Sequence, residues 1–199
     1  MDKNNTIRSN SLLSHYIYVS MLELNFDPFP VLETERLVLR QITLEDAPDI
    51  FALRSDPDAM KYIGRPRPKV VADVHELIAS MNELTVRIQW GATLRNESQI
   101  IGTIGYHLIE KQHDRAEIGY MLHPNYWNKG LMSEAIIAVV DFGFGKIGLH
   151  SIEARIDPEN KQSAKILVKN GFTKEGHLKE SFFYNGRFCD TGIYSLVRR

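Results

Sequence analysis

The sequence predicts one α+β domain with a mixed, mostly antiparallel sheet of about seven strands flanked by about four helices. The length of 199 residues, 43% of them hydrophobic and 25% charged, fits one ordinary globular domain. Three strand-like stretches between residues 87 and 122 are separated only by short polar turns, which is typical of antiparallel hairpins. After residue 130, helical and strand patterns alternate, which indicates βαβ-like connections.

The first element is a strand within residues 35–43, where apolar side chains alternate. Thr43 and Asp46 have the spacing of a capping box, so a helix is expected to begin there and to stop at Pro57. Periodicity then predicts a helix at 70–84, strands at 87–94, 100–109 and 116–122, a helix at 130–143, a strand at 150–156, a helix at 160–169 and strands near 178–184 and 188–197.

The domain is expected to span residues 31–199, after an N-terminal extension of uncertain status at residues 1–30. Two origins stay open for residues 1–20. An upstream start codon would explain them, since Met21 begins a plausible protein by itself, and so would a tail that docks on a partner.

Composition excludes several classes of protein. A formal net charge of −1 gives no reason to expect nucleic-acid binding, and no apolar run is long enough for a membrane span. The only cysteine, Cys189, cannot form an internal disulfide, which favours a cytoplasmic location. The seven histidines lack metal-ligand spacing, so no metal is expected. The run "GFGKIG" at 143–148 follows a helix and precedes a strand, so it predicts a helix end rather than a dinucleotide site.

The stretch "HPNYWNKGLMSEA", residues 123–135, places a glycine at the start of a helix. Free N–H groups and the helix dipole make such an end attractive to phosphate, and Gly130 allows a close approach. Lys129 adds a positive charge and Ser133 a hydroxyl. The other interpretation is an ordinary strand-to-helix turn that Gly130 merely relieves.

Three signatures in order favour the phosphate-binding interpretation: "LETERLVLR" (32–40), "YWNKGLMSEA" (126–135) and "NKQSAKILVKNGF" (160–172). Over residues 35–197 the chain resembles the GNAT acetyltransferase superfamily, and within it the branch of the ribosomal-protein N-terminal acetyltransferases. The resemblance implies a GNAT-like fold and acetyl-CoA-dependent transfer of an acetyl group to a primary amine by direct attack in a ternary complex. The acceptor would be a protein N-terminus, an amino acid or another small amine. The alternative is a non-catalytic acyl-CoA-binding or regulatory module on the same fold, and a homodimer stays open.

The resemblance also implies where acetyl-CoA binds. Trp127 occupies a position where the superfamily often has Gln or Arg, so the pyrophosphate would depend on main-chain N–H groups, and Met132 is expected to face the core. The strand edge would pair with the pantetheine arm, and the N–H near Leu122 would polarise the thioester carbonyl. The implied cofactor contacts are Tyr120, Met121, Leu122, Asn128, Lys129, Gly130, Leu131, Met132, Ser133, Asn160 and Ser163.

Two residues are implied to be catalytic. Many superfamily members have a tyrosine acid at the position of Leu167, so Ser163 on the same helix face would protonate the thiolate, while Asn160 is also a natural helix cap. Glu117 is the expected base, with an ion pair to Arg115 or a neighbouring basic residue as the other interpretation. Glu180 is the second choice of base.

The acceptor pocket is expected between the segments 61–68 and 181–188. Its predicted contacts are His107, Phe182, Tyr184 and Arg187, and Arg65, Arg67 and Arg187 could hold a carboxylate or an acidic peptide. Two plainer interpretations remain: a hydrogen-bonded core histidine at position 107, and solvated loop residues elsewhere. Phe182 replaces a carboxylate found in some ribosomal members, which argues against a ribosomal acceptor.

Overall fold

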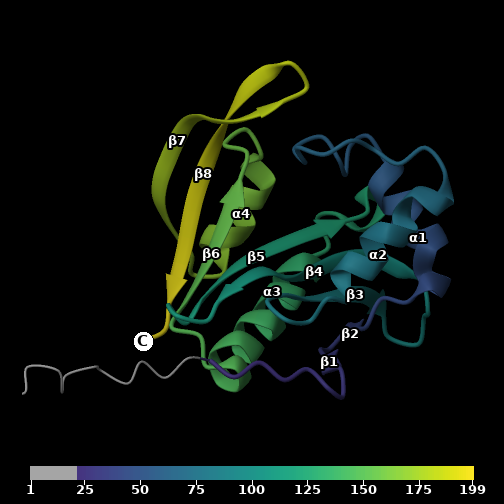
Figure 1. Cartoon of the computed structure of the whole chain (residues 1–199), viewed down its shortest axis with the longest axis horizontal. Coiled ribbons are helices and arrows are strands. Elements are labelled where there is room, and N and C mark those ends of the chain that lie inside the picture. The colour runs from purple at the N-terminus through teal and green to yellow at the C-terminus, as the bar shows by residue number, and fades with distance from the viewer. Residues whose placement is uncertain (1–21) are drawn as a thin grey trace, which may run out of the picture.

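The computed structural model describes residues 22–199, so the prediction for residues 1–20 lies outside the described part. Four α-helices flank one eight-stranded sheet of order β1-β2-β3-β4-β5-β6-β8-β7 (Figure 1). The strands are β1 (Leu32–Glu33), β2 (Leu37–Arg40), β3 (Ile88–Leu94), β4 (Ile100–Glu110), β5 (Arg115–Leu122), β6 (Ser151–Ile156), β7 (Thr173–Tyr184) and β8 (Arg187–Val197). The helices are α1 (Ala47–Ser55), α2 (His75–Met81), α3 (Leu131–Phe142) and α4 (Lys161–Lys169).

The sheet is antiparallel except at one junction. Strands β5 and β6 run parallel and pair only from Arg115↔Ser151 to Glu117↔Glu153. Beyond Glu117 they have no pairing, and Figure 1 shows β6, β8 and β7 turning away from β5. The predicted α+β class with a mixed sheet is therefore confirmed, and the sheet opens where β5 and β6 separate.

The two faces of the sheet carry different helices. Helix α3 packs on the main core, where Tyr106 of β4 donates a hydrogen bond to the Val139 carbonyl over 2.8 Å. Helices α1 and α2 build smaller clusters on the other face, where Leu53 of α1 packs with Met121 of β5. Because side chains alternate along a strand, β5 presents Ala116, Ile118 and Tyr120 to the α3 side, and Glu117, Gly119 and Met121 to the α1 side.

Three elements differ from the sequence prediction. Strand β1 is only two residues long, too short for a visible alternation, and it makes the sheet eight-stranded. Helix α2 ends at Met81 and follows a 3₁₀ turn at Val71–Val74, so it is shorter than expected. Strand β7 begins at Thr173 rather than near 178, because it is exposed along nearly its whole length and carries no apolar alternation.

The "GFGKIG" segment ends a helix, as predicted. A π-helical turn at Gly143–Ile147 continues α3 and closes at Gly148, whose φ is +86°. No helix among the described residues is long and apolar enough to cross a membrane.

Residues before position 31 take part in the packing. The Phe26 side chain is 6% exposed and lies 6.5 Å from the ring of Phe142 between centroids. Trp90 donates its indole N–H to the Pro30 carbonyl over 2.7 Å. The predicted boundary at residue 31 therefore lies inside the packed domain, which reaches back to Leu22.

Candidate active site

Beyond Glu117, β5 has one edge that β6 leaves unpaired. On its other edge β5 pairs with β4, and the N–H of His123, directly after the strand, donates to the Ile101 carbonyl over 2.9 Å. Since backbone groups alternate along a strand, the N–H and C=O of Leu122 both point to the unpaired edge. The Leu122 carbonyl accepts the indole N–H of Trp127 over 2.7 Å, which leaves the Leu122 N–H facing the open side.

The start of α3 follows closely on this edge, since the Trp127 indole binds the Leu122 carbonyl. Asn128 and Gly130 have φ values of +60° and +77°, and Gly130 is the N-cap of the helix. The first hydrogen bond within the helix runs from the Glu134 N–H to the Gly130 carbonyl over 3.1 Å. The N–H groups of residues 131–133 thus lack helical partners and form an anion-binding end.

A clamp from the β1–β2 turn fixes this helix end. The Glu134 carboxylate accepts hydrogen bonds from Thr34 Oγ1 (2.5 Å) and Arg36 N (2.8 Å) and pairs with the Arg36 guanidinium at 2.6 Å. Arg36 also donates to the Lys129 carbonyl over 2.9 Å. Burial alone would raise the pKa of Glu134, but these hydrogen bonds and the charge of Arg36 hold it below its usual value.

Arg36 was missed as a neighbour of the anion-binding end. Its guanidinium lies 3.5 Å from the place where a Cβ on Gly130 would sit. The one sequence signal for this contact was that the stretches "LETERL" and "NKGLMSEA" occur together in the chain. Arg36 lies in the first stretch and Glu134 in the second, and the two residues form an ion pair.

Three predicted cofactor side chains are engaged elsewhere. Lys129 lies over the ring of Tyr126, with Nζ 5.3 Å from the centroid. Ser133 donates to Asn170 Oδ1 over 3.1 Å, which ties α3 to α4. Met132 is 5% exposed within the main core, which confirms that it faces away from the anion-binding end.

A hydroxyl pair bridges β5 and α4. Tyr120 Oη lies 2.7 Å from Ser163 Oγ, and Ser163 is 7% exposed. Asn160 accepts the Ser163 N–H over 3.0 Å and so caps α4, as one interpretation expected, while Leu167 is fully buried. Burial raises the pKa of Tyr120 to about 12 although the bond to Ser163 lowers it, so the phenol is a neutral donor at physiological pH. The sequence argument considered only the backbone of Tyr120 and missed its hydroxyl.

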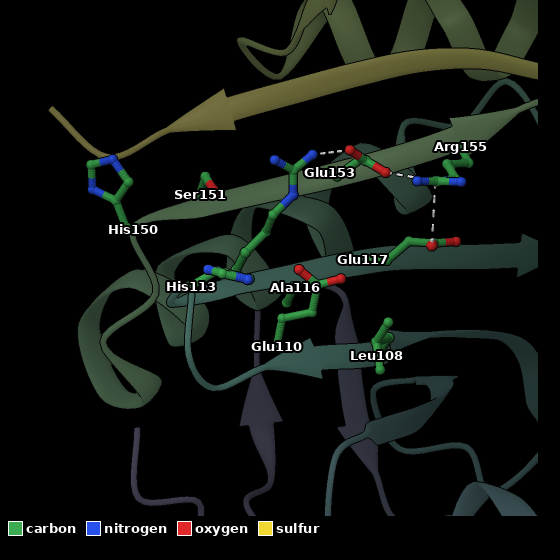
Figure 2. Close-up of a pocket in the computed structure, with 10 residues that line it drawn as sticks. Leu108, Glu110, His113, Ala116, Glu117, His150, Ser151, Glu153 and Arg155 are labelled. Carbon is green, nitrogen blue, oxygen red and sulfur yellow. Dashed lines mark hydrogen bonds and ion pairs between the residues drawn. The ribbon is translucent and has the colours of Figure 1, made fainter. Parts of the chain in front are cut away.

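Glu117 faces the opposite side of the sheet, in a cavity of about 600 Å³ (Figure 2). Burial raises the pKa of Glu117 although the charge of Arg155 lowers it, and the two side chains are 3.7 Å apart. Arg115 pairs with Glu153, which Arg155 also contacts at 2.6 Å. The basic neighbour of Glu117 is therefore Arg155, which lies within ion-pair distance of it, whereas Arg115 pairs with Glu153.

The other base candidate lies apart from this cavity. Glu180 has a φ of +49° and its N–H donates to Asp190 Oδ1 over 2.8 Å in the exposed hairpin of β7 and β8. Among the described residues, Glu117 is thus the candidate base whose pKa burial raises, which strengthens it as a proton acceptor.

The predicted acceptor residues fall into two groups. Phe182 on β7 approaches the α1–α2 loop, with its Cε2 2.9 Å from a Cβ built on Gly64. By alternation and pairing, Tyr184 and Arg187 share the hairpin face of Phe182. His107 lies on β4, where Gln89 Nε2 is 2.6 Å from its Nδ1. It is hydrogen-bonded, as the plainer interpretation expected, yet its side chain is exposed to solvent.

An opened β5 edge beside a glycine-capped helix end is the arrangement expected of an acyltransferase that binds an acyl thioester. A family model described as "Acetyltransferase (GNAT) domain" matches residues 36–173, and the chain belongs to this family. The resemblance seen in the three signatures is thereby confirmed.

The relatives agree with this assignment. An uncharacterized N-acetyltransferase of Bacillus subtilis, YoaA, is 40% identical over 85% of this chain and 98% of its own length. Spermidine N(1)-acetyltransferase of Escherichia coli is 36% identical over 40% of this chain and 43% of its own length. The structure of ribosomal-protein-S5-alanine acetyltransferase from Vibrio fischeri has a TM-score of 0.72 at 26% identity, over 84% of this chain and 96% of that one.

The protein is therefore an acetyl-CoA-dependent N-acetyltransferase, and the non-catalytic module is not favoured. The homodimer stays a prediction, and light scattering on the purified chain measures it.

Proposed function

We propose that acetyl transfer occurs at the β5–β6 opening, with Glu117 as base and Ser163, supported by Tyr120, as acid. The observation that carries this proposal is their placement. Glu117 and Tyr120 are three residues apart on β5, so their side chains leave opposite faces of the same strand beside the gap. An amine can approach from one face while the thiolate leaves toward the other.

The reaction begins with acetyl-CoA in the gap. Main-chain N–H groups at residues 128–133 hold the pyrophosphate, with Arg36 adjacent, and the edge at Tyr120–Leu122 pairs with the pantetheine arm. Asn160 and Ser163 border the arm from α4. The Leu122 N–H then donates to the thioester carbonyl, where negative charge develops.

Glu117 accepts a proton from the acceptor ammonium, directly or through one water, and the neutral amine attacks the carbonyl carbon. The tetrahedral intermediate then breaks its C–S bond. The departing thiolate takes the proton of Ser163 Oγ, and Tyr120 Oη, 2.7 Å away, supplies the replacement. The second proton on the attacking nitrogen leaves to solvent, and solvent returns a proton to Tyr120. Glu117 releases its proton to solvent before the next turnover. The acetylated amine and CoA are released.

The acceptor is a primary amine that enters from the side of His107, Phe182, Tyr184 and Arg187. The names of the relatives include a polyamine and a ribosomal protein as acceptors. The test is thiol release from acetyl-CoA with a panel of amines, for the wild type and for Ser163→Ala and Glu117→Gln. Both variants should lose turnover while acetyl-CoA still binds. Wild-type turnover in Ser163→Ala would remove Ser163 from the mechanism.

A further inference from the structure

Helix α1 buries an arginine without a counter-ion. Arg54 lies on the sheet-facing side of α1 with Ile50 and Leu53, and its side chain is 8% exposed. Its Nε has no hydrogen-bond partner, and no carboxylate within residues 22–199 forms an ion pair with it. Burial, together with the charge of Arg65, lowers the pKa of Arg54 to about 10. A buried cation without an anion is costly, so such a group is expected to serve a ligand.

A second arginine, directly before β3, also has a buried nitrogen without a partner among the described residues. This residue, Arg87, shares the α1-side face of that strand with Gln89. The buried nitrogen is its Nε. Because Ile88 pairs with Tyr106, Arg87 stands beside His107 across the strand pair.

His107 sits among these cations as a neutral imidazole. Burial among the surrounding elements and the charges of Arg54, Arg65 and Arg87 lower its pKa to about 4. Its side chain is nevertheless accessible to solvent, so a ligand can reach it. Gln89 Nε2 lies 2.6 Å from His107 Nδ1, and the neutral ring carries one N–H donor.

The cluster adjoins the reaction site. His107 Nε2 packs directly on Gly119, where a side chain would find no room. Gly119 lies between Glu117 and Met121 on the same face of β5. His107, which packs on Gly119, is therefore about two strand residues, or about 7 Å, from the candidate base Glu117. Arg65 joins from the α1–α2 loop, next to the Gly64 that approaches Phe182.

We propose that Arg54, Arg65 and Arg87 bind a carboxylate of the acceptor, so that the substrate class is an amine that carries a carboxylate, such as an amino acid or an acidic peptide. Guanidinium groups suit this task because their fork matches a carboxylate. The bound anion would pair the cations that the protein leaves unpaired, and the neutral His107 would add an N–H donor. A polyamine, by contrast, would bring further positive charge to three arginines. This inference rests on the proposed acetyl transfer and names its acceptor.

The experiment compares matched amines in the thiol-release assay with acetyl-CoA. Free amino acids, including glutamate, are paired with their amides, an acidic dipeptide is paired with its neutral counterpart, and spermidine is the polyamine arm. The carboxylate members should have kcat/KM values roughly ten- to hundredfold above their amides, the range of a charge-assisted hydrogen bond. A preference for free amino acids or for peptides identifies the source of the carboxylate.

Variants then assign the effect to the cluster. Arg54→Met should raise KM for the carboxylate acceptor at least tenfold and change KM for its amide much less, so that the preference for the carboxylate is lost. Arg87→Met and the loop variant Arg65→Met should do the same to a smaller degree, and Arg65 is exposed, so its loss does not threaten folding. Arg95→Met is the control, because Arg95 pairs with Glu33 at the surface. Equal use of acids and amides, or the highest kcat/KM for spermidine, would overturn the carboxylate site alone. No thiol release with any amine would instead refute the proposed transfer.

Discussion

Replacing Tyr120 by phenylalanine tests the hydroxyl pair between β5 and α4. The substitution keeps the ring and removes only the oxygen that lies 2.7 Å from Ser163 Oγ. Ser163 would keep its own proton but lose the group that supports it as negative charge develops on the oxygen. Hydrogen bonds to charged groups contribute about 1.5–3 kcal/mol, so kcat should fall roughly ten- to hundredfold.

Ser163→Ala should cost more, since a positioned general acid contributes on the order of 10²–10⁴ in rate. If the two hydroxyls form one relay, the double variant should be no slower than Ser163→Ala alone, because groups that act as a unit are not additive. The assay is thiol release at saturating acetyl-CoA, with acetyl-CoA affinity measured separately by calorimetry. The affinity should change less than about threefold, because the pair acts on the leaving group and not on the pyrophosphate.

Tyr106→Phe is the matched control. Tyr106 is buried and, like that of Tyr120, its hydroxyl makes a hydrogen bond, which it donates to the Val139 carbonyl. It lies in the main core between β4 and α3 and makes no hydrogen bond to Ser163. Its loss should lower the melting temperature and leave kcat unchanged. Additive rate losses for Tyr120→Phe and Ser163→Ala, or a wild-type kcat for Tyr120→Phe, would refute the relay.

Predictions for three further residues follow from the same geometry. Since burial raises the pKa of Glu117, the wild-type rate should climb with pH through a value above that of an ordinary glutamate, and Glu117→Gln should lose this rise in a pH–rate profile while Glu180→Gln keeps it. Because the pKa of Glu117 is raised in the folded state, its ionised form destabilises the fold at pH values above the pKa of the unfolded carboxyl. Glu117→Gln should therefore melt at a slightly higher temperature than the wild type at pH 7. A lower melting temperature would contradict the burial argument. Gly130→Ala should cost about 1–2 kcal/mol of stability, because φ is +77°, and should raise KM for acetyl-CoA; a wild-type KM would show that the phosphate binds elsewhere. Glu134→Gln should cost about 1–3 kcal/mol in urea unfolding at pH 7. Because the folded pKa of Glu134 is lowered, the difference from wild type should shrink as pH falls through that value, and an equal loss at all pH values would assign it to packing.

The sequence predicted the helices and strands that bury apolar side chains in the core. Helix α3 and strands β3 to β6 have clear apolar periodicity, and their bounds lie within two residues of the predicted ones. Strand β7 lacked this signal because nearly all of it is exposed, and Phe26 entered the core although it lies before the predicted boundary. Periodicity reports burial, so it is silent on exposed strands and on short segments that cover the core without regular structure.

The position of a site residue could be predicted from the sequence when it depends on a single helix or strand. Contacts between residues of different helices and strands could not. Asn160 as the cap of α4 and Met132 as a core residue follow from helix geometry alone. The Tyr120–Ser163 pair, the Arg36–Glu134 clamp and the cluster around His107 each join residues at least 18 positions apart. Local spacing carries no information about such pairs, so only the three-dimensional arrangement of β4, β5 and the helices reveals them.

Trp127 shows how a departure from a family motif can be absorbed by the backbone. A glutamine or arginine there could donate to the pyrophosphate, whereas the Trp127 indole donates to the Leu122 carbonyl. That bond holds the loop before α3 against the end of β5, and so fixes the distance between the anion-binding end and the Leu122 N–H. Trp127→Phe removes this donor and keeps an aromatic ring. It should therefore lower both acetyl-CoA affinity and kcat, since the two ends of the cofactor would no longer be held in register. An effect on affinity alone would mean that the indole bond does not position the thioester.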